Sequence, residues 1–541
     1  MMRQYIALLV MSGMLSGCAM DSLKTLTGST YEGVDGKYIH SLTPETNQTH
    51  AKQTVTSEKS EVAEEDRVFY RAAADKNLIA NPYAEKYLNG ILAKLLDTWG
   101  QPVDRDIKVV ISADRNYSAL ATMDTIVVTQ GVLGDADSED ELAFIIAHEL
   151  SHILLDHNDT NEYFAKQSAL VSKAANIAMV SAVVSDLETQ KTANGIKLSS
   201  KNSASANKAL TDSYRIGVTI NRLSRDVLSS SMSRQDEDEA DLLGVDLIVK
   251  AGYSARAYYD VMDRLESSQV FNKAQLAAKK QDFQSFVSMA SKAEKHVNGS
   301  NLETLGYLAA NEAATRLLQD FADRHNSPSE RKQDLNHYVK REYRIERRRD
   351  FSTEKMNKAL HSGKAKQIQK NYWAASEAMR AVEFGDLDKA EKLARQAVSG
   401  PTSSHAYPRL AYYTVRKLQN KPDKAAQNLA LIKNWDYASI QTFALASQAF
   451  RSQKQHQKAE QVLNKAKATI GSDKPFLPEY VALYRSMGEQ AKLDEHLKRC
   501  HNVKEQNIVV QCQQAAGVAI PEDTKKASKG LFDSITSFVE I

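Results

Sequence analysis

The chain has 541 residues, too many for one ordinary hydrophobic core, so two or three domains are expected. Hydrophobic residues make up 42% and charged residues 26%, as in soluble globular proteins, and only 22 glycines and 10 prolines favour a mostly helical fold. The formal net charge is +2, which gives no electrostatic case for nucleic acid as a partner.

Residues 1–18 predict a signal peptide with a positively charged start. Its apolar stretch, 5–15, is too short to span a bilayer. Residues 15–18 (LSGC) resemble the lipobox of bacterial lipoproteins, which implies a mature chain that begins at an acylated Cys18 and is anchored to a membrane. Ala19 then implies the periplasmic face of the outer membrane. A plain secretory signal with a coincidental cysteine is the alternative.

The other two cysteines agree with such a compartment. If Cys18 carries lipid, Cys500 and Cys512 remain as an even pair in an oxidising space, and a disulfide between them is plausible. Two free thiols are the alternative. The most apolar internal stretch, 174–184, is too short to span a membrane.

The mature chain begins with polar sequence. Residues 19–60 are rich in Thr, Ser, Gly and Lys and predict a flexible tether with an r.m.s. reach of roughly 35 Å. A helical pattern follows from 61 to about 99, and β-branched runs predict strands at 107–111 and 125–129. A Ser-x-x-Glu capping box then starts a helix over 138–156. Further on, 158–232 has helical character, and another helix covers about 236–250.

The helix over 138–156 contains the sequence AHELSH. His148 and His152 are one helical turn apart, so they lie on the same face and can bind one Zn²⁺ at about 2.0–2.1 Å. Glu149 lies about 100° around the helix, where it suits a general base better than a metal ligand. A helix that happens to carry two surface histidines is the alternative.

A catalytic zinc needs a third protein ligand. His157 is too close along the chain, and we interpret it as a surface residue or one that supports a ligand. Glu237 and Asp241 are four residues apart and share a helix face, so Glu237 can bind zinc while Asp241 accepts a hydrogen bond from a ligand imidazole. A solvated acidic helix start is the alternative.

Beyond about residue 370 the chain repeats every 34 to 35 residues. The same position of the repeat is marked by Ala390, Ala425, Ala459 and Leu493. Five residues earlier, a tight turn between helices is expected at Gly385, Asn420, Lys454 and Gly488. Seven residues later, a buried helix face is expected at Ala397, Ile432, Ala466 and Cys500. The period is similar to that of tetratricopeptide repeats, whose concave face commonly holds protein partners. An irregular helical bundle is the alternative.

AHELSH, Glu237 and the sequence Ala240-Asp241-x-x-Gly244 together resemble metallopeptidase family forty-eight, the zinc peptidases of the HtpX and CAAX prenyl protease type. Within it, the repeats resemble the BepA-like periplasmic branch. The resemblance implies an α+β zincin-type peptidase domain, one Zn²⁺ per chain, and an edge strand beside the zinc on which an extended peptide can lie.

A further motif of that family matches His325 and Arg331, although the proline stands at 328 rather than directly after the histidine. The resemblance implies that both residues stabilise the oxyanion formed during hydrolysis. Alternatively, His325 reaches the open position of the zinc and keeps the enzyme latent, or it is a loop histidine that caps a helix.

The expected organisation is a peptidase domain over 61–350, tetratricopeptide-like repeats over 351–515 and a tail over 516–541 that is either a cap or a docking peptide. The expected fold is mostly α with a small β-sheet, followed by an α-helical solenoid. The expected function is that of a membrane-anchored periplasmic zinc metalloendopeptidase that hydrolyses misfolded or misassembled envelope proteins, which its repeats recruit.

The alternative function is that of an outer-membrane assembly chaperone or scaffold whose protease is largely latent. The basic run 341–349 (REYRIERRR) is read either as a contact with anionic lipid or a partner, or as a solvated helix.

Overall fold

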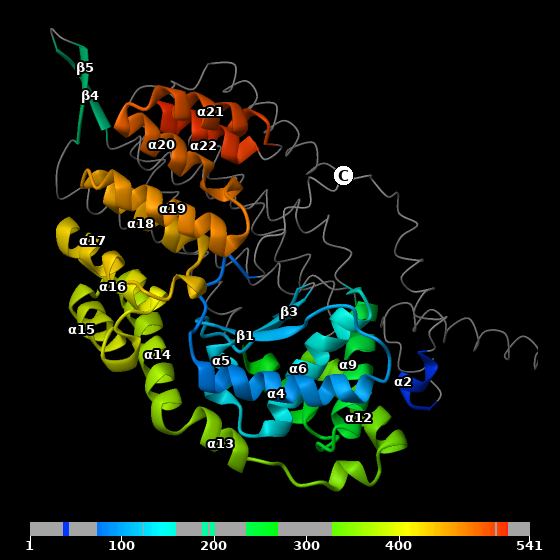
Figure 1. Cartoon of the computed structure of the whole chain (residues 1–541). Helices are drawn as coiled ribbons and strands as arrows, with labels where there is room; N and C mark the ends of the chain where they lie inside the picture. Colours follow the sequence, from blue (N-terminus) through cyan, green and yellow to red (C-terminus); the bar gives the residue numbers. More distant parts are fainter. Residues whose placement is uncertain are drawn as a thin grey trace, which may run out of the picture.

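The computed structural model describes residues 36–42, 73–122, 124–157, 187–192, 195–200, 234–268, 327–503 and 506–517. These residues form an α+β body and an array of helical hairpins that curves away from one side of it (Figure 1). The expected fold, mostly helical with a small sheet, is confirmed. Cys18, His325 and most of the expected tail lie outside the described residues.

The body contains a three-stranded sheet in the order β1-β3-β2. β1 (Lys108–Ser112) runs parallel to β3 (Thr125–Thr129), and β2 (Ala119–Ala121) runs antiparallel to it. The central strand β3 is buried along its whole length, which explains its continuous run of β-branched residues. The two strands expected from the sequence are therefore found, and β2 forms an edge of this sheet.

Further helices of the body pack against the sheet or against one another. They are α4 (Pro82–Trp99), α5 (Gln130–Asp135), α6 (Glu139–Leu154), α9 (Arg234–Lys250) and α12 (Pro328–Glu342). As the capping pattern predicts, the Ser138 side chain accepts the amide hydrogen of Glu141 at the start of α6. The Glu141 carboxylate instead accepts from the amide of Asp137, so only half of the reciprocal box forms.

α6 and α9 approach each other closely. A Cβ added at Gly244 would lie only 3.3 Å from the backbone nitrogen of His148 and 3.4 Å from its Cα. Both helices are buried on nearly every face, so their buried residues lie all around each helix and not along a single stripe. The glycine therefore sets how near the backbone of α9 lies to that of the zinc helix.

The short helix α2 (Tyr38–Ser41) packs against the body and contacts residues that are far away in the sequence. The amide of Ile39 donates to Oδ2 of buried Asp246 on α9 at 2.7 Å. The hydroxyls of Tyr338 and Tyr343 donate to Oδ1 of the same carboxylate, each at 2.7 Å. The expectation of a tether over 19–60 is therefore wrong for residues 36–42, because Asp246 offers a buried acceptor for their backbone.

The expected helical character of 158–232 is likewise wrong where the structure describes that segment. β4 (Leu187–Thr192) and β5 (Gly195–Ser200) pair as an antiparallel hairpin. No helix among the described residues is long and apolar enough to cross a membrane.

The array consists of stacked helical hairpins (Figure 1). Its helices are α13 (Glu354–Leu360), α14 (Gly363–Glu383), α15 (Leu387–Ala397), α16 (Ala406–Leu418), α17 (Pro422–Ala430), α18 (Ile440–Ser452), α19 (His456–Ile470), α20 (Leu477–Met487), α21 (Gln490–His501) and α22 (Gln506–Ala516). Short 3-10 helices lie between them or before them: η4 (Glu346–Arg348), η5 (Gly400–Thr402), η6 (Trp435–Tyr437) and η7 (Lys474–Phe476).

The 34-residue register of the sequence appears directly in the backbone of this array. All four turn positions have a positive φ, at 78° for Gly385, 58° for Asn420, 59° for Lys454 and 72° for Gly488. The marker positions and the positions seven residues later are buried in each repeat. Each hairpin thus turns through one left-handed residue, as the sequence predicts. The tetratricopeptide assignment itself stays a prediction.

Specific contacts stabilise the two ends of the array. At its start, Ser376 of α14 donates to the carbonyl oxygen of Ala113 at 3.0 Å and accepts from Gln130 at 2.7 Å, which joins it to the body. At its end, a buried disulfide joins Cys500 of α21 to Cys512 of α22. α22 closes the stack by packing against α20 and α21.

Candidate metal centre

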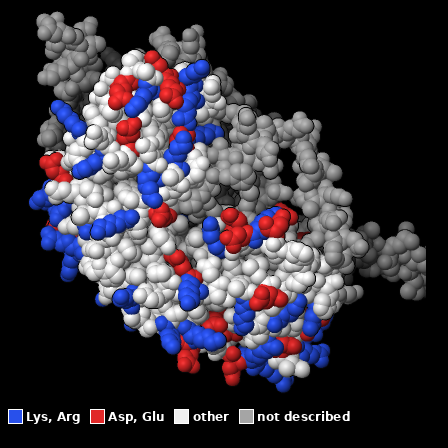
Figure 2. Space-filling view, viewed as in Figure 1, with Lys and Arg blue, Asp and Glu red and all other residues white. Residues whose placement is uncertain are grey.

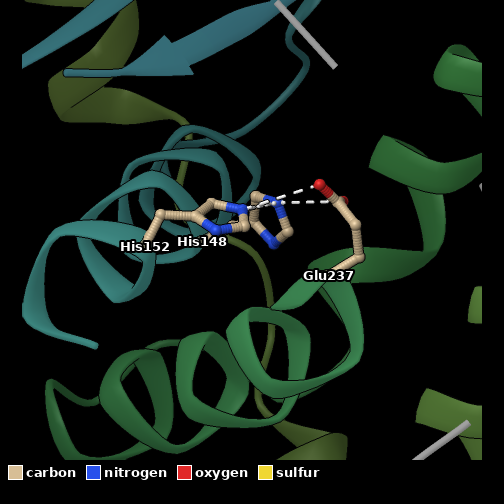
Figure 3. A group of neighbouring side chains, drawn as sticks. All are labelled: His148, His152 and Glu237. Atoms are coloured by element: carbon tan, nitrogen blue, oxygen red, sulfur yellow. Dashed lines mark hydrogen bonds and ion pairs between the residues drawn. The ribbon is translucent and has the colours of Figure 1, made fainter. Parts of the chain in front are cut away.

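Three side chains from two helices converge on one point of the body (Figure 3). α6 provides His148 and His152, whose Nε2 atoms lie 3.1 Å apart, and α9 provides Glu237. The Glu237 carboxylate lies 3.5 Å from Nε2 of His148 and 3.7 Å from Nε2 of His152. The three potential ligand atoms all lie within 4.8 Å of one another. Two imidazoles and one carboxylate are a donor set of catalytic zinc sites, so the residues present fit Zn²⁺.

The other ring nitrogen of each histidine faces a partner. Nδ1 of His148 lies 2.9 Å from Oδ1 of Asp241, one turn beyond Glu237 on α9. Nδ1 of His152 lies 3.0 Å from Nδ1 of His157, which is itself 3.4 Å from the Glu239 carboxylate. Such partners hold the rings in place and direct both Nε2 atoms toward a shared metal.

Arg331 links the acidic residues of the site. From α12, its Nη1 lies 2.8 Å from Oε2 of Glu237, while Nε and Nη2 donate to the two Asp241 oxygens. The guanidinium therefore positions the expected zinc ligand and the carboxylate behind His148. The oxyanion role expected for Arg331 stays a prediction, and His325 lies outside the described residues.

The charges of this cluster favour a bound cation. Burial alone would raise the pKa of Glu237, but the Arg331 charge and the contact with His148 hold that pKa well below its usual range. Burial opposes protonation of His148, yet its contacts with Asp241 and Glu237 raise its pKa to about 10. A site negative enough to retain a proton on a buried imidazole also attracts a divalent cation.

Glu149 lies next to the ligands and faces the edge of the sheet. Burial raises the pKa of its carboxyl to about 7, while the His148 charge and a hydrogen bond from the backbone of Ala121 in β2 oppose this. A carboxylate with a pKa close to neutrality can both accept and return a proton. The arrangement therefore combines a metal site, a proton carrier and an edge strand.

Comparison with known families identifies the domain that holds this centre. Residues 82–339 match Peptidase family M48. These residues form an M48 peptidase domain. They extend from α4 into α12 and so include every residue of the metal centre. The resemblance to this family is confirmed, whereas the periplasmic branch stays a prediction. A search of curated proteins gives no match.

The M48 domain brings together His148, Glu149, His152, Glu237 and Asp241, all of which helix spacing had singled out. The sequence left two connections open: whether His157 supports a ligand, which its contact with His152 now favours, and which residues Arg331 contacts. His157 lies just beyond α6, where Asp156 has a φ of 55° and turns the chain back toward His152. The contact of Arg331 with Glu237 requires α12 to lie beside α9. The sequence carries no strong signal for a turn at Asp156, where the backbone becomes left-handed. Helical spacing alone therefore could not show where the side chain of His157 lies.

Proposed function

We propose that this M48 metallopeptidase is an endopeptidase that hydrolyses misfolded or misassembled envelope proteins in the periplasm while anchored to the outer membrane through Cys18. The observation that carries the proposal is the convergence of His148, His152 and Glu237 beside Glu149. Peptidases of this family are zinc-dependent, and one zinc ion per chain fits this single cluster among the described residues.

The residues of the site divide the chemistry between them. Bound zinc supplies a Lewis acid that polarises a carbonyl group and makes water more acidic. Glu149 accepts the proton of the attacking water and delivers it to the leaving amine nitrogen. Asp241 and His157 keep the two imidazole rings oriented.

The edge strand β2 gives a place for the substrate backbone. An extended peptide can pair with the backbone groups of β2 that β3 does not use, as in other cases of strand addition. Since the Ala121 backbone already contacts Glu149, such a peptide passes next to the proton carrier. Backbone pairing selects unfolded chains rather than one sequence, which favours misfolded proteins as substrates.

The location and the partners rest on separate features. The LSGC sequence at 15–18 and the Cys500–Cys512 disulfide both suit a lipoprotein of an oxidising compartment. The array exposes large apolar side chains, Phe384 at 72% and Leu431 at 49%, which suit the recruitment of unfolded polypeptides.

The decisive experiment uses the Glu149→Gln variant of the full chain. We expect it to retain zinc but to lose hydrolysis of an unfolded protein such as casein, whereas Glu495→Gln on the exposed face of α21 should behave as wild type. Expressed in cells, the inactive variant should trap envelope proteins that are identified after crosslinking. Continued hydrolysis by Glu149→Gln would overturn the mechanism.

A second function is an assembly scaffold with a latent protease. It is favoured if Glu149→Gln supports envelope assembly in cells as well as wild type does. The anchor is tested by the mass of the N-terminal peptide and by the release of Cys18→Ser from membranes.

A further inference from the structure

The segment after α12 concentrates positive charge. Residues 340–349 contain six basic and two acidic residues, a net charge of +4 in a chain whose total is +2. Figure 2 shows lysines and arginines gathered at the lower right of the molecule, where Figure 1 places α12 and the chain that follows it. This charge takes no part in the metal centre.

The segment is held rigidly at both ends. Tyr343 is buried, and its hydroxyl donates to Asp246 at 2.7 Å. Six residues later, Nη1 of Arg349 donates to the carbonyl oxygens of Val249 and Tyr253, each at 2.9 Å. Between these two anchors the chain forms a loop and η4. The basic residues therefore stand on a fixed support rather than on a loose tail.

An isoleucine projects from the middle of this loop. Ile345 is 80% exposed, more than any other large apolar side chain among the described residues. Arg344 and Arg348 beside it are also exposed, and neither forms an ion pair with a described residue. A solvated basic helix gives no reason to hold an apolar side chain in water, whereas a surface that enters a lipid interface combines apolar and basic residues in this way.

The N-terminal part of the chain enters the body at the same place. The Lys37 ammonium lies 4.9 Å from the centre of the Tyr343 ring, and α2 follows directly. Cys18 precedes Lys37 by 19 positions, so it can lie at most about 65 Å away. If Cys18 is acylated, which rests on the proposed function, this face of the molecule is kept near the membrane.

We propose that a basic tip, formed by Lys37, Lys340, Arg344, Ile345, Arg347 and Arg348, rests on an anionic phospholipid surface. The arginines pair with lipid phosphates, and Ile345 enters the head-group region. The metal centre lies toward the opposite ends of α9 and α12 from the tip and is thereby held at a constant orientation to the membrane.

A label on the tip tests this directly. An environment-sensitive fluorophore is attached to Ile345→Cys in the full chain, while Phe384→Cys on the array provides a control at another highly exposed apolar position. The bonded Cys500 and Cys512 do not react, and labelled wild type gives the background. With phosphatidylcholine vesicles that contain phosphatidylglycerol, we expect a blue shift at 345 and none at 384. Vesicles of phosphatidylcholine alone should produce no shift.

Charge variants then test whether the basic residues of the tip cause its contact with anionic vesicles. Each basic residue near an anionic surface strengthens binding by roughly fivefold, so Arg344→Gln with Arg348→Gln should weaken the contact by roughly 30-fold as the phosphatidylglycerol fraction is varied. Lys424→Gln with Lys458→Gln removes the same charge from exposed positions of the array and should change nothing.

Three results would overturn the proposal. They are no shift at 345, an equal shift with neutral vesicles, and an equal shift at 384. A shift produced by soluble polyglutamate but not by vesicles would also overturn it and would assign the basic tip to an acidic polypeptide. The label reports contact whether or not Cys18 is acylated, so failure of the anchor and failure of this surface are distinguished.

Discussion

Arg331 and Asp241 are joined by two hydrogen bonds, from Nε to Oδ2 at 2.8 Å and from Nη2 to Oδ1 at 2.7 Å. The remaining terminal nitrogen contacts Glu237 at 2.8 Å. A planar guanidinium can satisfy both carboxylates at once, whereas an ammonium group acts as a single point of charge. Arg331 therefore orders the side of the metal centre that α9 provides.

The Arg331→Lys variant should accordingly bind zinc less tightly while keeping its charge. Loss of partners behind metal ligands typically weakens metal affinity by about 10-fold to 100-fold. Competition with a chromophoric chelator measures the zinc dissociation constant, and Arg341→Lys, exposed near the end of the same helix, provides the control. Unchanged zinc affinity together with lost turnover would contradict the positioning role and would support the oxyanion role expected from the sequence.

The close contact of α6 and α9 gives a second prediction. In Gly244→Ala the new methyl group would meet the His148 backbone at 3.3 Å, so the helices must separate by a few tenths of an ångström. We expect a loss of about 1–3 kcal/mol of stability and weaker zinc binding. Gly90→Ala on the exposed face of α4 meets nothing within 4 Å and should be neutral or stabilising. Thermal unfolding with and without zinc measures the loss of stability and the loss of zinc binding. Equal unfolding temperatures for the two variants would contradict the packing argument.

The metal ligands could be predicted because helix periodicity converts spacing into geometry. Residues four apart lie on one face, so His148 and His152, and then Glu237 and Asp241, were paired from the sequence alone. The turns of the array were predictable for a similar reason, since a fixed period repeats one turn position. What could not be predicted is which helices pack together, and Arg331 reaches Glu237 only through such packing.

At two other places the structure differs from what the sequence led us to expect, and each difference has a local physical cause. The sequence around the β4–β5 hairpin contains Asn194-Gly195, a dipeptide common in hairpins, but the surrounding Ser- and Ala-rich helical composition outweighed that signal. Residues 36–42 look irregular in the sequence, but Tyr38, Ile39 and Leu42 are buried in the core and the amide of Ile39 donates to the buried Asp246 of a distant helix. The average composition of a segment does not reveal specific buried contacts, such as the hydrogen bond to Asp246, that help to decide where the segment lies.

Asp246 also predicts a pH dependence of stability. Burial raises its pKa from 3.8 to about 6, although hydrogen bonds from Ile39, Tyr343 and Tyr338 oppose the rise. The folded state then holds the proton more tightly, so the contribution is present below about pH 4 and is lost as the pH rises through about 6. Relative to Asp246→Asn, wild type should lose up to about 3 kcal/mol across this window. Denaturation at several pH values measures the difference, and a gap that widens in favour of wild type with rising pH would contradict this sign.

The turn of the third hairpin gives the last prediction. Lys454 has a φ of 59°, and its amide and that of Gln455 bond back to the end of α18, which holds it in the left-handed region. A side chain with a Cβ costs about 1 kcal/mol there, whereas glycine does not. Glycine also gains freedom in the unfolded chain, which offsets part of this benefit, so Lys454→Gly should stabilise the array by only about 0.5 kcal/mol. Asn420→Gly should gain less, since asparagine tolerates this conformation better. Lys458→Gly, inside α19, should instead lose about 1 kcal/mol. Calorimetry of the full chain ranks the three variants, and a loss for Lys454→Gly as large as that for Lys458→Gly would show that the turn is not strained.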